Sequence, residues 1–295
     1  MKPSITLGRL FGVEIGLHYS WFIIALLITL SLGGHFGETN PGWSRAIIWT
    51  SAVVTAVLFF VSIVVHELSH VLVGRARAVP ARSITLFALG GVATMETAAP
   101  DARTEFWIAV AGPLASIAIG LGCYGLAASL GWSPQSEIGP STAVLGWLGY
   151  INISLAVFNL IPGFPLDGGR ILRAVLWARS GDADGATMTA ARVGQAVAFG
   201  FILIGVMRFF AGAGFGGLWM AFIGWFLLQA AQASYAQVAV VADLRGVRVR
   251  DIMSTDCTTV DADMRVQTLV DEHLLRTGQR CFVVGAPGRI VGLIT

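Results

Sequence analysis

The chain has 295 residues, of which 55% are hydrophobic and 12% are charged. Soluble globular domains carry about 25% charged residues, so this chain has too little polar surface to cover a water-soluble fold. Its formal net charge is only +2, and its basic residues do not cluster with aromatic ones on a soluble face. These features exclude a nucleic-acid-binding protein and give no support for an acidic partner.

The apolar residues gather in long runs, which we interpret as membrane-spanning helices. In chain order the runs cover residues 20–33, 46–73, 106–130, 144–161, 193–207 and 218–233. The first run is short enough for a signal peptide, but no good small-x-small cleavage site follows it, so we expect it to be retained. The sequence therefore predicts an all-α polytopic membrane protein with about six transmembrane helices.

Arginines and lysines predict how these spans are oriented. They lie before the first span, between the second and third, between the fourth and fifth, and after the sixth. The alternate loops hold only Arg45 and Arg208 as basic residues. By the positive-inside rule, we expect a multi-pass protein of the cell (plasma or inner) membrane with both termini in the cytosol.

Composition changes near residue 241, where charged residues reach the density of soluble proteins. We therefore predict a transmembrane domain over residues 1–240 and a cytosolic segment over residues 241–295.

The three cysteines are separated along the chain. Cys123 lies in an apolar run, and Cys257 and Cys281 lie in the polar tail. None belongs to a Cys-x-x-Cys pair, so we expect small buried thiols, without a disulfide or a thiolate metal site.

The second span contains three titratable residues, His66, Glu67 and His70, in almost wholly apolar surroundings. Such groups are costly in a bilayer and usually face a cavity and carry function. Residues i and i+4 project from one face of a helix, so both histidines can reach one metal ion. Glu67 is close enough to act as general base on a water molecule. A chance match is the alternative, which the apolar setting disfavours.

A catalytic zinc site needs a third protein ligand and an open position. The other histidines do not suit: His18 precedes the first span, His35 is expected in the first outer loop, and His273 is in the tail. Carboxylates remain, and Asp167 lies in a Pro- and Gly-rich segment that closes the fourth span. That segment can fold the chain back towards a cavity, although an ordinary turn leaving the membrane is also open.

Depth favours the metal site over the ordinary turn. His66 lies about 25 Å along its helix from Trp49, in a hydrocarbon core of about 30 Å. The histidines should therefore lie towards the cytosolic side, and Asp167 follows the cytosolic end of the fourth span. A shared site at one depth, near the cytosolic face, is the prediction.

The two motifs together resemble those of the site-2 protease family of intramembrane zinc metalloproteases. The first is the His-Glu-Leu-Ser-His run at residues 66–70, and the second is Asn159 and Pro162 followed by Pro-Leu-Asp-Gly at residues 165–168. The resemblance implies one Zn²⁺ ion per active site, held by His66, His70 and Asp167. It also implies a catalytic role for Glu67, and it places Asn159 near the substrate or the oxyanion.

Two further stretches resemble parts of the same family. Residues 86–93 are similar to a small membrane-associated β-hairpin, and residues 111–116 are similar to a stretch in the span that follows. An exposed strand edge near Gly90 and Gly91 could pair with an unwound substrate.

The reaction implied by the resemblance is regulated intramembrane proteolysis, in which a peptide bond within a transmembrane helix of a membrane-protein substrate is hydrolysed. A metal-binding transporter and a non-catalytic scaffold of the same fold are the alternatives. Transport would favour polar residues along several spans, which are scarce here, and the intact Glu67 argues against a scaffold.

The tail from Val249 to Thr295 resembles a single CBS motif, which implies a short α+β segment. CBS motifs pack in pairs, so we expect either that the sequence continues or that a homodimer supplies one motif from each chain. An adenine nucleotide bound at this CBS-like segment is implied by the resemblance alone. A linker without a ligand is the alternative.

Overall fold

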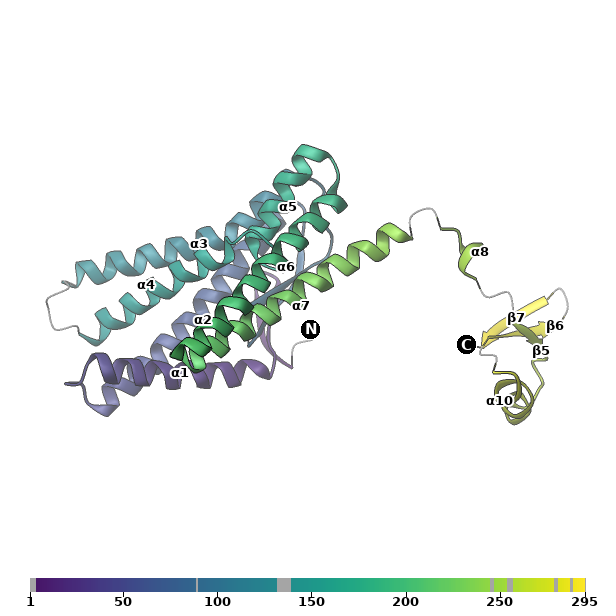
Figure 1. Cartoon of the computed structure of the whole chain (residues 1–295), viewed down its shortest axis with the longest axis horizontal. Helices are drawn as coiled ribbons and strands as arrows, with labels where there is room; N and C mark the ends of the chain where they lie inside the picture. The colour runs from purple at the N-terminus through teal and green to yellow at the C-terminus, as the bar shows by residue number, and fades with distance from the viewer. Residues whose placement is uncertain are drawn as a thin grey trace. The chain divides into compact units, whose positions relative to one another are not determined.

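The computed structural model describes residues 4–88, 90–131, 139–244, 247–253, 257–278, 281–286 and 289–294. The chain forms two compact units, Met1–Ala239 and Val240–Thr295. The first unit holds the long helices and a four-stranded sheet, and the second holds a three-stranded sheet with short helical turns (Figure 1).

Six helices of the described residues are long and apolar enough to cross a membrane, which confirms the predicted fold class. They are α1 Ser20–Thr39, α2 Arg45–Ala76, α3 Ala102–Ser129, α4 Pro140–Asn159, α6 Ala183–Arg208 and α7 Phe215–Asp243. A π-helical turn, η1 Phe209–Ala213, follows α6. Many large apolar side chains on these helices are exposed, as expected for surfaces that face lipid. The protein is a multi-pass membrane protein.

Local signals explain where two of these helices begin. The hydroxyl of Ser44 accepts a hydrogen bond from the Ile47 backbone N–H at the start of α2. The carboxylate of Asp101 accepts one from the Thr104 backbone N–H at the start of α3, at 2.8 Å. The hydrogen bonds from Thr104 also hold the pKa of Asp101 below its usual range.

A short helix, α5 Asp167–Ser180, lies between α4 and α6. Its 14 residues are too few to span a bilayer. The predicted helix break after Asn159 is present as a turn over residues 160–166, but Asp167 is the first residue of α5 and not a turn residue. The backbones of Gly168 and Gly169 lie so close to residues 160–164 that a Cβ atom at either would collide with them. The beginning of α5 is therefore packed tightly against the end of α4.

The expected hairpin is present as β3 Ala81–Phe87 and β4 Gly90–Met95, but it belongs to a larger sheet. Two further strands, β1 Ile5–Leu10 and β2 Val13–Leu17, give the order β1-β2-β3-β4. The β2–β3 pair is parallel and the other two pairs are antiparallel. Leu89, inside the predicted hairpin, lies outside the described residues.

The main apolar core lies between α2 and this sheet. It contains buried side chains of α2, β2 and β3: Val13, Leu17, Phe60, Ile63, Leu68, Val71, Ile84 and Leu86. Helix α3 packs against α2, α4 and α5, and Figure 1 shows α3 and α4 running side by side. The core thus fixes the C-terminal half of α2, where the two histidines lie, against the sheet on one side and α3 on another.

The second unit is a small α+β segment, as expected. Strands β5 Thr258–Val260, β6 Phe282–Ala286 and β7 Arg289–Ile294 form a sheet in the order β5-β6-β7. The helical pieces are α8 Val249–Ile252, α9 Val266–Thr268, η2 Leu269–Leu274 and α10 Leu275–Thr277. Val260, Leu269 and Phe282 form its small core. Residues 254–256, 279–280, 287–288 and Thr295 of the predicted CBS-like segment lie outside the described residues.

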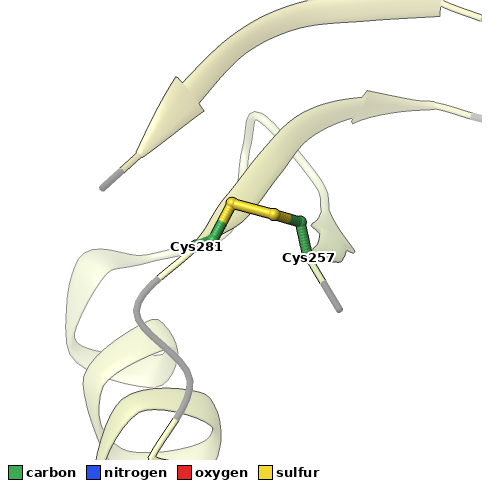
Figure 2. Close-up of a disulfide and its surroundings, with 2 residues drawn as sticks. All are labelled: Cys257 and Cys281. Atoms are coloured by element: carbon green, nitrogen blue, oxygen red, sulfur yellow. A yellow bond between two sulfur atoms is a disulfide. The ribbon is translucent and has the colours of Figure 1, made fainter. Parts of the chain in front are cut away.

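The expectation that the cysteines form no disulfide is wrong for two of them. Cys257 and Cys281 are joined by a disulfide, with their Cα atoms 4.9 Å apart (Figure 2). Each directly precedes a strand, and Thr258 pairs with Phe282 in the parallel β5–β6 register. The pairing of two strands distant in sequence brings the sulfurs together, so the spacing of the cysteines in the sequence does not predict the bond. Cys123, in α3, is free.

Candidate active site

Three buried side chains from two helices converge at the end of α4. His66 and His70 lie one turn apart on α2, and Asp167 begins α5. The Oδ2 atom of Asp167 lies 3.2 Å from Nε2 of His66 and 3.3 Å from Nε2 of His70. The two Nε2 atoms are 3.3 Å from each other. The predicted trio is thus brought together by the fold, and its ligand atoms all lie within 4.8 Å of one another.

The spacing of these three atoms fits a zinc ion. Donor atoms bonded to one tetrahedral zinc at about 2.0–2.1 Å lie about 3.3 Å from each other. The three measured separations, 3.2, 3.3 and 3.3 Å, agree with that value. Two imidazoles and a carboxylate are also a donor set that catalytic zinc sites use, with one position left open. The cluster can therefore hold zinc.

The Nδ1 atoms of the two histidines are held by α3. Nδ1 of His70 lies 2.6 Å from the carbonyl oxygen of Ile108, which can only accept, so this nitrogen donates. A neutral His70 then carries its lone pair on Nε2, which faces Asp167. Nδ1 of His66 lies 2.9 Å from the hydroxyl of Ser116, which is fully buried. Both rings are thus oriented for metal binding through Nε2.

Gly112 lies between Ile108 and Ser116 on α3 and makes room for both rings. A Cβ atom at this position would collide with Nε2 of His70 and with Nε2 of His66. The close approach of α3 to α2 at the candidate site therefore requires a residue without a side chain. The resemblance of residues 111–116 to the family pointed to this stretch but not to its role.

Glu67 and Asn159 line one cavity of about 810 Å³. Most of the other lining side chains are apolar and come from α1, α2, α4 and α7. Gly90 and Gly91 of β4 line the same cavity, and a Cβ atom at Gly91 would collide with the Glu67 side chain. The structure therefore brings Asn159, Gly90 and Gly91 to the cavity wall that holds Glu67 and His66.

The remaining histidines lie away from the candidate metal site. His18 is a structural residue: its Nδ1 atom lies 2.8 Å from the Ser20 hydroxyl at the start of α1. His35 is not in an outer loop, because α1 continues to Thr39, and it lines the cavity instead. The apolar run ends near Gly33, so the span predicted from composition stopped before the actual end of the helix. His273 lies in η2 of the second unit.

Sequence reasoning missed the residues that surround the trio. Glu105, Ile108 and Ser116 all lie on α3 and contact α2 or α5. Arg170, one turn after Asp167, pairs with Glu105. The sequence offered two signals, an acidic residue at the start of an apolar span and an arginine three residues after Asp167, but neither shows its partner.

Comparison with known proteins identifies the family. The model of peptidase family M50 matches residues 54–138 and 133–203, and that of the CBS domain matches residues 249–295. The chain is 36% identical over 295 residues to Rip3 of Mycobacterium tuberculosis, named as a zinc metalloprotease, with 100% of this chain and 75% of the relative covered. This chain belongs to peptidase family M50, the site-2 proteases. The family predicted from the two motifs is thereby confirmed.

Two further relatives agree. A zinc metalloprotease of Synechocystis is 34% identical over 296 residues, covering 100% of this chain and 76% of the relative. The solved site-2 protease from Methanocaldococcus jannaschii is 30% identical, with a TM-score of 0.53, covering 78% of this chain and 94% of that protein. The protein is accordingly a membrane zinc metalloprotease with a CBS domain at its C-terminal end, and the comparisons favour this class over a metal transporter.

Proposed function

We propose that this M50 peptidase hydrolyses a peptide bond within a transmembrane segment of a membrane-protein substrate, in regulated intramembrane proteolysis. The observation that carries the proposal is the buried His66–His70–Asp167 cluster beside Glu67, at the wall of an apolar cavity within membrane-spanning helices. These three residues would hold one zinc ion. When bound, zinc polarises a peptide carbonyl and makes water acidic enough to lose a proton near neutral pH.

Glu67 supplies the proton transfers in this proposal. Its carboxylate takes a proton from the attacking water, whose oxygen bonds to the carbonyl carbon of the scissile peptide. The same carboxyl then gives the proton to the leaving nitrogen as the C–N bond breaks. Asn159, on the same cavity wall, can donate from its amide to the carbonyl oxygen that becomes negatively charged.

The cavity suggests how a substrate is bound. A transmembrane helix hides its peptide groups in internal hydrogen bonds, so it must unwind before cleavage. Among the described strands β4 pairs with β3 alone and forms an edge of the sheet. Its residues Gly90, Gly91 and Val92 line the cavity beside Glu67. We propose that the unwound substrate adds to this edge as a strand, with its side chains in the apolar cavity.

The position of the protein in the cell belongs to the same proposal. Both termini and the active-site end of α2 would face the cytosol, in the cell membrane. Residues 1–240 would form the protease domain and residues 241–295 a regulatory segment. Adenine nucleotide binding by this segment, and its pairing with a second chain, remain predictions.

The proposal is tested by mapping cleavage sites in membrane proteins by mass spectrometry, in cells that carry wild-type protein or Glu67→Gln. The variant should keep zinc, because Glu67 is a base and not a ligand, and should lose about 10²- to 10⁴-fold in turnover. Glu38→Gln, an exposed acid at the end of α1, is the matched control and should cleave normally. Wild-type cleavage by Glu67→Gln would require a different base.

A further inference from the structure

Glu105, in the first turn of α3, is a buried acid that the proposed reaction does not use. Its side chain is 5% exposed and pairs with two arginines of α5. Arg170 donates from Nε to Oε1 at 3.0 Å and from Nη2 to Oε2 at 3.4 Å. Arg173 lies with Nη1 3.3 Å from Oε1. The two-point contact with Arg170 joins α3 and α5 in one defined geometry.

Arg170 is the neighbour of Asp167 on the surface of α5. Arg170 follows Asp167 at i+3, and Arg173 follows Arg170 at i+3, so each lies beside the residue one turn before it. Leu166, at the N-cap position of α5, offers no side-chain hydrogen bond to hold the first turn. The ion pair one turn further on is a side-chain contact that ties the first turns of α5 to α3 and so limits its rotation about its axis.

One face of α3 contacts every element of the candidate metal site. Glu105, Ile108, Gly112 and Ser116 are spaced i, i+3, i+7 and i+11, which places them in one stripe. Ile108 and Ser116 hold the histidine rings, and Gly112 leaves space for both. Glu105 contacts the helix that carries the remaining carboxylate. The stripe therefore contacts both histidines directly and, through Glu105, the helix that begins with Asp167.

We infer that Glu105, acting through Arg170 and with Arg173, is a positioning residue that holds the Asp167 carboxylate at the distance a zinc ion requires. This inference rests on the proposed metal site. A buried ion pair adds little net stability compared with apolar residues of similar size, so a contribution to geometry accounts better for these three charges. Residues that orient metal ligands typically change metal affinity about 10- to 100-fold when they are replaced.

The test measures zinc dissociation constants by chelator competition on the purified full chain. Glu105→Gln and Arg170→Met should each weaken zinc binding about 10- to 100-fold. The double variant should be about as weak as either single variant, because both changes remove the same contact. Arg179→Met, an exposed arginine on the same helix, is the matched control and should stay within about twofold of wild type.

The thermal midpoint of the zinc-free protein is measured in parallel, to separate positioning from stability. The double variant removes both charges of the Glu105–Arg170 pair, so neither is left without the other. The amide oxygen of the glutamine at position 105 can still accept a hydrogen bond from Arg173. If a single variant does not fold, the double variant should still fold, and its zinc affinity is then the deciding measurement. The inference is overturned if zinc affinity stays within twofold of wild type, or if the double variant recovers both midpoint and affinity. A wild-type protein that binds no zinc would overturn the metal site itself.

Discussion

Asp167 is the residue on which the candidate metal site depends most. Two histidines at i and i+4 supply only two protein ligands, and a catalytic zinc needs a third. The position of Asp167 follows from the turn after α4 and from Gly168 and Gly169, whose missing side chains let α5 begin against the backbone of residues 160–164. Its side chain is 12% exposed, and the carboxylate oxygen Oδ2 faces both Nε2 atoms.

The first prediction compares carboxylates in one segment. Asp167→Asn should weaken zinc binding by about 100-fold or more, since indirect changes alone cost about 10- to 100-fold. Asp182→Asn should bind zinc normally, because Asp182 is exposed and caps α6, a role that asparagine also fills. Zinc content of the purified variants is the measurement. Equal zinc in both would remove Asp167 from the ligand set.

A second prediction at this scale concerns the histidines. His66→Ala or His70→Ala should each lose most of the bound zinc, because each removes one of three ligands. Replacing His18, which contacts Ser20 at the start of α1, should leave zinc unchanged. Metal analysis after gel filtration separates these cases. Full zinc in both alanine variants at positions 66 and 70 would contradict the site.

At the scale of elements, α3 supports the site although it supplies none of the three candidate ligands. Its buried stripe orients the rings of His66 and His70 and contacts α5 through Glu105. Helix α2 thus presents the histidines, α5 presents the carboxylate, and α3 fixes the two against each other. Strand β4 adds an edge beside Glu67, where we propose that the substrate backbone binds.

The packing of the α3 stripe leads to a prediction opposite to the one that helix propensity gives. Alanine is the better helix former, yet Gly112→Ala should reduce zinc binding and cleavage at least about 10-fold, because its Cβ would collide with both imidazole rings. Gly122→Ala, in the same helix with open space around it, should keep both. Zinc affinity and cleavage of the two variants are compared side by side. Normal zinc affinity in Gly112→Ala would show that α3 can move away without cost.

At the scale of the whole molecule, the orientation in the membrane decides from which side the site is reached. In a background without Cys123, Cys257 and Cys281, Gly42→Cys should react with a membrane-impermeant maleimide added outside intact cells. Ser180→Cys should react only after the cells are opened, because the arginine-rich segment around it is predicted to be cytosolic. Labelling in the opposite pattern would place the site near the other face.

Some features of this protein were determined by the sequence alone, because their signals are local. A run of apolar residues specifies a span wherever it folds, and His66 and His70 share a face in any α-helix. The Pro- and Gly-rich segment after the fourth span indicated Asp167, which the family motif also implied, and the motif added Asn159. These signals predicted six spans and the three residues whose ligand atoms meet in the structure, but they ended α1 before His35.

Tertiary structure decided whatever depends on contacts between distant segments. The parallel pairing of β2 with β3, the Cys257–Cys281 disulfide and the pairing of Glu105 with Arg170 each join residues far apart in the chain. Strand β2 is buried along almost its whole length, so it lacks the alternation that marks a half-exposed strand. A single residue carries no sign of which partner it will meet, because that partner is chosen by how the helices and sheet pack.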